Sequence, residues 1–238
     1  MKYRQHYTPL TFACKEQYKE IVKVLVENGA DVDKEDGFGN IPLTSACKEN
    51  GDDIIDILMK NGANVNKKNK NGETPLIKAI QHSSYKYNDK GIECSKNNYL
   101  LNLNDKDENG NYPVLCASRN NDKILMTMLL EYAKDNNILL KLNERDNEGK
   151  TPLIYACEHG NKDIIKILIE NGADIDMKDQ KGNIPLNICI RKDTENDNEL
   201  VQYLIDHDVD IFQEDNDGYI PLNYALESNQ QSVINSFN

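Results

Sequence analysis

Proline spacing constrains the fold of this chain more than any other feature of the sequence. The seven prolines stand at Pro9, Pro42, Pro75, Pro113, Pro152, Pro185 and Pro221, at intervals of 33, 33, 38, 39, 33 and 36 residues. A fixed period of roughly 20 to 50 residues is typical of an array of one repeated supersecondary unit. We therefore expect a repeat protein with one unit for each proline.

Aligning the units on proline brings other residues into register. Gly stands three residues before six of the prolines, at Gly39, Gly72, Gly110, Gly149, Gly182 and Gly218. Ala stands four residues after six of them, at Ala13, Ala46, Ala79, Ala117, Ala156 and Ala225, and Cys189 takes this place in the remaining unit. Apolar pairs such as Ile164-Ile165 follow twelve and thirteen residues after proline.

Each aligned position has a role in a pair of helices. Thr8, Thr74 and Thr151 precede a proline, where a hydroxyl can accept a backbone N–H at the helix N-terminus and proline costs no donor. Small Ala or Cys residues allow neighbouring helices to approach closely. The glycines twenty residues after proline, such as Gly172, permit a left-handed cap at the end of a second helix.

The unit is similar to a known repeat. Residues 151–179, TPLIYACEHGNKDIIKILIENGADIDMKD, resemble the ankyrin repeat almost throughout, and the resemblance covers residues 8–238. It implies an all-α solenoid of stacked helix pairs joined by β-turn or hairpin loops, in a single domain of residues 1–238. The seven units are approximately 1–35, 36–68, 69–106, 107–145, 146–178, 179–214 and 215–238.

The sequence departs from the ankyrin pattern at a few places. Ile41, Tyr112, Ile184 and Ile220 replace the capping Thr, and Asp208 replaces a Gly. The third, fourth and sixth units carry insertions. We interpret the last unit, with polar residues such as Asn235, as a C-terminal cap. The first unit keeps an internal pattern, which leaves two alternatives: either further repeats once preceded it, or MKYRQHY covers that face.

Two near-copies end the third and fourth units. NNYLLNLNDKDENGNYPVL at 97–115 and NNILLKLNERDNEGKTPLI at 136–154 are 39 residues apart. We predict a full second helix, KILMTMLLEYA, before the second copy. Before the first copy we predict a longer loop around SSYKYND and a short helix near Ile92. The same alignment predicts that four leucines are buried, Leu100, Leu101, Leu139 and Leu140, and that Tyr85 and Tyr87 are at least partly exposed.

Charge and hydropathy restrict the class of partner. The net charge is −12, and eleven acidic residues but no Lys or Arg follow Lys192. A nucleic-acid-binding protein usually carries a basic stripe instead, so we expect no nucleic-acid partner. No apolar run reaches the roughly 20 residues of a membrane span, and the first residues lack a secretory h-region. We expect a monomer in the cytoplasm, with the nucleus as the alternative.

Catalytic and metal-binding patterns do not stand out. Cys14, Cys47 and Cys157 share one position of the first helix, so they recur along the stack and do not converge on one metal. Burial as small apolar residues accounts for them better. His82 and His159 also share one position, which indicates a surface preference. We expect no enzyme activity, no catalytic or metal-binding residues and no cofactor.

The ankyrin resemblance implies a protein-binding face formed by the loop tips and the exposed ends of the first helices, on the concave side. Carried over by position, the candidate partner-binding residues are Phe38, Asn40, Lys48, Lys70, Gln81, His82, Asn111, Arg119, Asn120, Lys150, Glu158, His159, Arg191 and Tyr219, together with Tyr85 and Tyr87 from the third-unit insertion. Phe38 and Tyr219 stand out because exposed aromatic residues are favoured at binding hot spots.

Two functions remain open. The chain is either a non-catalytic scaffold or adaptor, or the targeting arm of a larger effector or enzyme whose catalytic domain lies outside this sequence. The acidic end, which includes Asp206, Glu214, Asp215 and Asp217, has two interpretations as well. It either steers a basic segment of the partner or keeps a terminal repeat soluble.

Overall fold

The helices begin where the prolines predict. The computed structural model describes residues 6–48, 51–82, 100–192 and 199–237, and within these ranges the chain forms 13 helices and no strand. The first helices of the pairs are α1 (Pro9–Lys15), α3 (Pro42–Lys48), α5 (Pro75–His82), α7 (Pro113–Arg119), α9 (Pro152–His159), α11 (Pro185–Lys192) and α13 (Pro221–Glu227). The second helices are α2 (Lys19–Glu27), α4 (Asp52–Lys60), α8 (Lys123–Asp135), α10 (Lys162–Glu170), α12 (Glu199–Ile205) and α14 (Gln231–Ser236).

The predicted threonine caps are confirmed. The hydroxyl oxygens of Thr8, Thr74 and Thr151 each accept the backbone N–H three residues later, at 3.0, 3.2 and 3.3 Å. At two of the three helices where isoleucine replaces the threonine, a side chain from the first turn accepts the N–H of the isoleucine itself. Thr44 does this for Ile41 at 3.3 Å and Asn223 for Ile220 at 2.9 Å. At Ile184 the equivalent residue, Asn187, is buried and its amide oxygen accepts no hydrogen bond from the described residues.

The ends of the second helices adopt the predicted left-handed conformation. Gly29, Gly62 and Gly172 have φ of 83°, 86° and 92°. Asp208, which stands in place of this glycine, has φ of 62°. Asp and Asn are the side chains that tolerate this region best, because their short polar groups bond locally.

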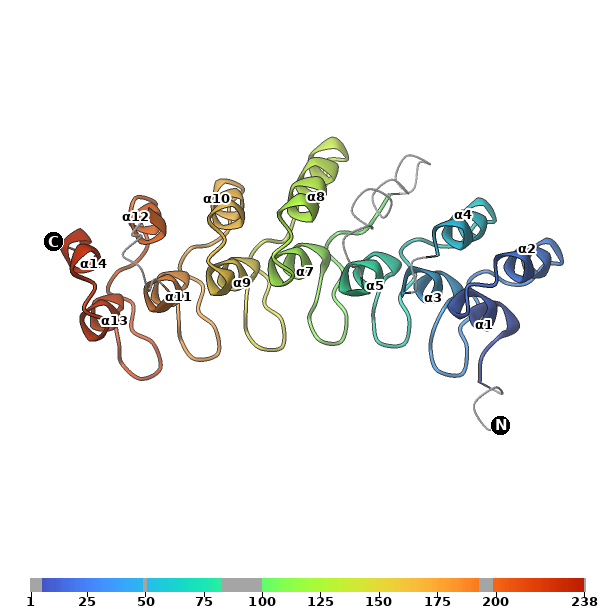
Figure 1. The fold of residues 1–238 in the computed structure, drawn as a ribbon, viewed down its shortest axis with the longest axis horizontal. Coiled ribbons are helices and arrows are strands. Elements are labelled where there is room, and N and C mark those ends of the chain that lie inside the picture. Colours follow the sequence, from blue (N-terminus) through green and yellow to red (C-terminus); the bar gives the residue numbers. More distant parts are fainter. Residues whose placement is uncertain (1–5, 49–50, 83–99, 193–198, 238) are drawn as a thin grey trace. The chain divides into compact units, whose positions relative to one another are not determined.

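The chain divides into two compact units. Unit 1 comprises residues 1–116 and 127–140, and unit 2 comprises 117–126 and 141–238. In unit 1, α3 packs against both α1 and α5, while α2 and α4 form a second row (Figure 1). In unit 2, α11 packs against both α9 and α13, and the second helices α10, α12 and α14 each pack on their own first helix. In both units the loops that precede the prolines extend from the first helices, away from the second helices (Figure 1).

Small residues line the contacts between the first helices. The aligned alanines are all buried, at Ala13, Ala46, Ala79, Ala117, Ala156 and Ala225. The described cysteines are also buried, which confirms their interpretation as small apolar residues: Cys14, Cys47, Cys116, Cys157 and Cys189. Burial raises the pKa of Cys14 to about 12, so this thiol stays protonated and unreactive at neutral pH.

One Asp or Asn organises each loop before a proline. The six residues share the position six before proline: Asp36, Asn69, Asp107, Asp146, Asp179 and Asp215. In each loop the side-chain Oδ1 accepts the N–H groups two and four residues later, at 2.8–3.0 Å. Because one oxygen satisfies two loop N–H groups, the loop tips are held in one conformation.

The prediction for the two near-copies is only partly correct. Leu101 is buried and Leu140 is partly buried, but Leu100 is 60% and Leu139 is 89% exposed, so the prediction that these two are buried is wrong. The apolar residues that enter the core are Leu101 and Leu103 in one copy and Leu142 in the other. Tyr85, Tyr87 and the rest of the third-unit insertion lie outside the described residues.

Helix lengths explain why Leu139 is exposed. The fourth repeat is six residues longer than the fifth, because its proline is followed by the next proline after 39 residues and not after 33. Helix α8, which contains the predicted KILMTMLLEYA, has 13 residues against 9 in α10, so four extra residues extend the helix by about one turn. The other two of the six extra residues lie beyond Asn137, which has a left-handed conformation (φ 54°). Leu139 falls in this extension and is exposed.

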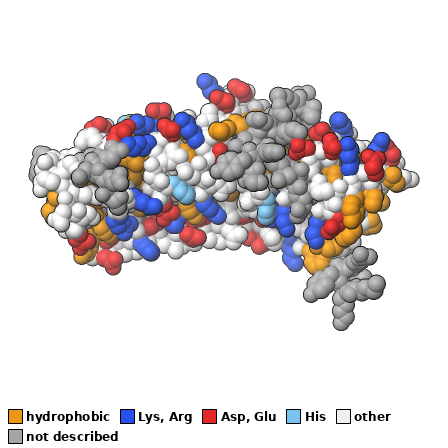
Figure 2. Space-filling model, viewed as in Figure 1, with side chains coloured by type: hydrophobic (Ala, Val, Ile, Leu, Met, Phe, Trp, Pro, Cys, Tyr) orange, Lys and Arg blue, Asp and Glu red, His pale blue; other side chains and the backbone are white. Residues whose placement is uncertain are grey.

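At the end of unit 1 that carries α1 and α2, apolar residues are exposed whose equivalents in other repeats are buried. Pro9 is exposed, whereas the other six prolines are buried. Ile21 is 50% exposed, whereas its equivalents Ile54 and Ile164 are 1% and 0% exposed. Figure 2 shows apolar side chains gathered at this end.

Candidate partner-binding face

The predicted site residues lie on the loops and first helices, with different degrees of exposure. Eight are exposed: Phe38, Lys48, Lys70, His82, Asn120, His159, Arg191 and Tyr219. Five are partly buried, namely Asn40, Gln81, Arg119, Lys150 and Glu158, and Asn111 is buried. Tyr85 and Tyr87 lie outside the described residues. Most of the predicted set therefore reaches the surface.

In unit 1, Phe38 belongs to an aromatic cluster at the first loop. Its ring centroid lies 4.7 Å from that of Tyr7 and 5.1 Å from that of His6, and Phe38 remains 39% exposed. The Lys15 ammonium donates a hydrogen bond to the Tyr7 hydroxyl at 3.1 Å. The residues just before α1 thus support Phe38 as an exposed aromatic contact.

Two predicted residues of unit 1 hold a loop together. The amide nitrogens of Asn111 and Gln81 donate to Oδ2 of Asp107, at 2.8 and 3.1 Å. Asp107 is itself buried, with its Oδ1 engaged by the loop backbone. Asn111 therefore fixes the loop that carries its neighbours, and Gln81 links α5 to it.

In unit 2, one arrangement of Arg, Tyr and Asp occurs twice. The Arg119 guanidinium lies over the ring of Tyr155, 5.2 Å from the centroid, and the Tyr155 hydroxyl donates to Oδ2 of Asp146 at 2.6 Å. In the second copy, Arg191 lies 4.8 Å from the centroid of Tyr224. The Tyr224 hydroxyl likewise donates to Oδ2 of Asp215. We call these the first and second Arg–Tyr–Asp stacks.

The stacks change the ionisation of their members. Burial raises the pKa of Tyr155 well above its usual range, and the hydrogen bond to Asp146 adds to this effect. Burial and the hydrogen bond to Asp215 raise the pKa of Tyr224 to about 12. Burial by itself would raise the pKa of Asp215, but hydrogen bonds from Tyr224 and the loop N–H groups hold it below its usual range. Both phenols thus remain neutral donors to a carboxylate.

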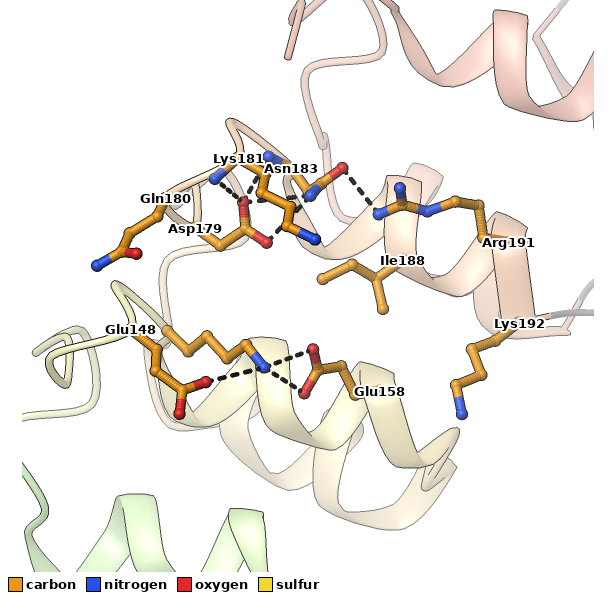
Figure 3. Close-up of a pocket in the computed structure, with 10 residues that line it drawn as sticks. Glu148, Glu158, Asp179, Gln180, Lys181, Asn183, Ile188, Arg191 and Lys192 are labelled. Atoms are coloured by element: carbon orange, nitrogen blue, oxygen red, sulfur yellow. Dashed lines mark hydrogen bonds and ion pairs between the residues drawn. The ribbon is translucent and has the colours of Figure 1, made fainter. Parts of the chain in front are cut away.

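A pocket of about 540 Å³ lies on the loops before α9 and α11 and on these two helices, and it includes Arg191 of the second stack. It is lined by Glu148, Lys150, Glu158, Asp179, Gln180, Lys181, Asn183, Ile188, Arg191 and Lys192. Figure 3 shows Ile188 between Glu158 on one side and Asn183 with Arg191 on the other. The pocket therefore has an apolar floor and charged walls.

On the α9 wall of the pocket, one cation contacts two carboxylates. The Lys150 ammonium lies 2.9 Å from Oε1 and 3.1 Å from Oε2 of Glu158, and 3.4 Å from Oε2 of Glu148. Burial alone would lower the pKa of Lys150, but these two carboxylates outweigh burial and raise it. Lys150 therefore stays charged.

The α11 wall is held by hydrogen bonds around Asn183. Asn183 is buried, and its amide nitrogen donates to both oxygens of Asp179, at 3.2 and 3.0 Å. Its amide oxygen accepts a hydrogen bond of 2.8 Å from Nη2 of Arg191 (Figure 3). Arg191 is thus fixed by an amide and by the ring of Tyr224.

Arg119 and Arg191 were predicted from the sequence, but the tyrosines that they stack on were not. Tyr155 and Tyr224 share the position three after proline, and Arg119 and Arg191 share the position six after proline in the preceding repeat. This shared spacing was the signal that could have revealed the stacks. Lys181 and Ile188 were also not predicted, because neither recurs at its position in the other units.

The match to a family model settles the family. The model described as "Ankyrin repeats (3 copies)" matches residues 10–89, 89–179 and 171–237. The chain belongs to the ankyrin-repeat family. The all-α fold of stacked helix pairs predicted from the sequence is thereby confirmed.

Two solved ankyrin-repeat structures illustrate how far the similarity extends. The first is the ankyrin repeat domain of Bcl-3, described as a unique member of the IkappaB protein family, with a TM-score of 0.75 and 20% identity. The comparison covers 97% of this chain and 98% of that one. The second is the human ASB11 ankyrin repeat domain, with a TM-score of 0.71, 23% identity and the same two coverages. At this identity the likeness concerns the fold alone. A search of curated proteins found no match.

Ankyrin repeats mediate protein–protein interactions. Within the described ranges of this ankyrin-repeat chain, no helix has the length and hydropathy of a membrane span. The same ranges contain no group of three or more His, Cys, Asp or Glu side chains arranged to hold a metal ion.

The acidic end of the chain contains one residue with an internal role. Asp215, one of the six loop-organising residues, is buried and accepts hydrogen bonds from the loop and from Tyr224. Glu214 and Asp217 are exposed. A charge-reversal test of partner steering must therefore spare Asp215, because reversal there would break the loop.

Proposed function

We propose that the chain is a non-catalytic scaffold or adaptor that binds a protein partner through the face formed by its loops and first helices. The observation that carries this proposal is the rigid, repeated construction of the loops. In six loops one Asp or Asn side chain fixes two backbone N–H groups. A face that is already ordered before binding loses little conformational entropy when it binds.

The exposed side chains of this face suit protein recognition. Phe38 and Tyr219 are 39% and 38% exposed and are supported by neighbouring aromatic rings. The predicted residues of this face also include charged side chains, of which Lys48 and Lys70 are exposed and Glu158 is partly buried. Aromatic anchors within a polar, charged surround are the usual composition of a specific protein interface.

The proposal is tested by mapping where partner segments bind. A library of protein segments from the source organism is displayed on phage and selected on the full chain. Hydrogen–deuterium exchange of the chain is then measured with and without each selected segment. We expect slower exchange in the loops at 36–40, 69–73, 107–111, 146–150, 179–183 and 215–219 and in the first helices. Protection confined to α4, α8, α10 and α12 would contradict the proposal.

We also propose that the chain acts as a monomer in the cytoplasm or nucleus. Light scattering coupled to size-exclusion chromatography checks the first point, and fractionation of the source cell checks the second. A mass that rises towards that of a dimer at micromolar concentration would contradict the monomer.

A further inference from the structure

The pocket between α9 and α11 has a charge opposite to that of the whole chain. Its lining contains four cations, Lys150, Lys181, Arg191 and Lys192, and three anions, Glu148, Glu158 and Asp179, which gives a net charge of +1. The chain carries −12. The pocket is thus a local basic site on an acidic protein.

The anions of the pocket already have partners within it. Both oxygens of Glu158 and one of Glu148 contact Lys150. Asp179 accepts hydrogen bonds from the N–H groups of Lys181 and Asn183 and from the Asn183 amide. Each carboxylate of the lining therefore already contacts a cation or a hydrogen-bond donor.

Three of the four cations have no such partner. Lys181, Arg191 and Lys192 are exposed and form no ion pair with any residue in the described ranges. Arg191 is nevertheless held in place, by Asn183 at 2.8 Å and by the ring of Tyr224. Its charge also acts on Asp215, whose carboxylate accepts the hydrogen bond of Tyr224, but Arg191 forms no direct ion pair with it. The fork geometry of an exposed guanidinium matches a carboxylate.

The apolar floor of the pocket sets a second requirement for a ligand, in addition to negative charge. Ile188 is only 6% exposed, and Figure 3 shows it between the two charged walls. A ligand that fits must bring methylene groups to Ile188 and one negative charge to Arg191 and the two lysines. An Asp or Glu side chain has both.

We propose that this pocket receives an acidic side chain, Asp or Glu, from the segment that binds the loop-and-first-helix face; this rests on the function proposed above. One carboxylate balances the net charge of +1. A phosphate group carries nearly two negative charges at neutral pH and would meet the carboxylates of Glu148, Glu158 and Asp179 in the same walls. A carboxylate is therefore the better match.

The test uses the full chain and a phage library of random 12-residue peptides. We expect Asp or Glu to be enriched at one fixed position among the peptides selected on the wild-type chain. In a synthetic copy of the strongest peptide, changing that residue to Asn or Gln should raise Kd by at least about tenfold.

A pair of charge variants locates the effect. The double variant Lys181→Glu and Lys192→Glu should bind the synthetic peptide at least about tenfold more weakly. The double variant Lys60→Glu and Lys134→Glu, which makes the same change in net charge on α4 and α8, should bind it like the wild type. Circular dichroism of both variants checks that they are folded.

The outcomes separate this inference from the proposed function. Peptides that protect the loops and first helices in hydrogen exchange, but show no acidic enrichment, would overturn the inference and leave the function standing. Equal weakening in both charge variants would also overturn it, because the effect would come from net charge alone. If no selected peptide protects that face, the proposed function fails and the inference fails with it.

Discussion

The Tyr155 hydroxyl donates a 2.6 Å hydrogen bond to the buried Oδ2 of Asp146, and this bond ties α9 to the loop that precedes it. Replacing Tyr155 with Phe keeps the ring beneath Arg119 but leaves a buried carboxylate oxygen without this donor. We expect a loss of about 1–3 kcal/mol in the free energy of unfolding, measured by urea denaturation.

Tyr203→Phe is the matched control for this change. The Tyr203 ring also lies under a cation, Lys166, at 5.4 Å from the centroid, but its hydroxyl makes no hydrogen bond within the described ranges. We expect a change within about 0.5 kcal/mol. Equal losses in the two variants would show that the hydrogen bond to Asp146 does not stabilise the fold.

Replacing Asp146 with Asn should lower the stability of the fold less than replacing it with Ala. Asn69 occupies the same position in its own loop and accepts the same two backbone N–H groups through Oδ1, at 3.0 and 2.9 Å. Asp146→Asn keeps this acceptor, so we expect a cost of about 1–2 kcal/mol, whereas Asp146→Ala leaves both N–H groups unpaired and should cost about 3 kcal/mol or more. Urea denaturation of both variants measures the difference, and equal costs would contradict the role given to Oδ1.

Tyr224 should make stability depend on pH in the alkaline range. Its pKa is raised from 10.0 to about 12 in the folded chain, first by burial and then by the hydrogen bond to Asp215. Because the folded pKa lies above the unfolded one, this contribution is fully present below pH 10 and is lost as the pH rises through 12. Comparing wild type with Tyr224→Phe across this range isolates the effect from lysine titration. A difference in stability that stays constant up to pH 12 would contradict the assigned pKa.

A terminal repeat and an internal repeat should respond differently to truncation of the same residue type. Ile21 and Ile164 hold equivalent positions, but their exposed fractions are 50% and 0%. Ile164→Ala removes buried methyl and methylene groups and should cost about 2–5 kcal/mol. Ile21→Ala should cost less than about 1 kcal/mol, because much of its surface is already in water. Similar costs, measured by thermal and urea unfolding, would show that Ile21 is covered in solution.

The sequence predicts the local geometry of this fold well, because each recurring residue solves a backbone problem by itself. Proline starts a helix, threonine caps it, and glycine or Asp208 takes the left-handed position. The Arg–Tyr–Asp stacks were not predicted, because Arg119 and Tyr155 belong to different repeats and contact each other only once those repeats pack. The pocket depends on the same packing of repeats, so the sequence around Ile188 and Lys181 did not indicate that they line a pocket.

The exposed leucines show the limit of hydropathy as a guide, and they supply a final test. Leu139 and Leu142 are both apolar residues of one near-copy, yet their exposed fractions are 89% and 6%, because Leu139 falls in the two-residue extension beyond Asn137. Leu139→Asn should change the free energy of unfolding by no more than about 0.5 kcal/mol. Leu142→Ala should cost about 2–5 kcal/mol, since it leaves a cavity in the core. If urea unfolding shows Leu139→Asn to be the more costly change, the register of this loop is wrong and the original expectation of a buried Leu139 is restored.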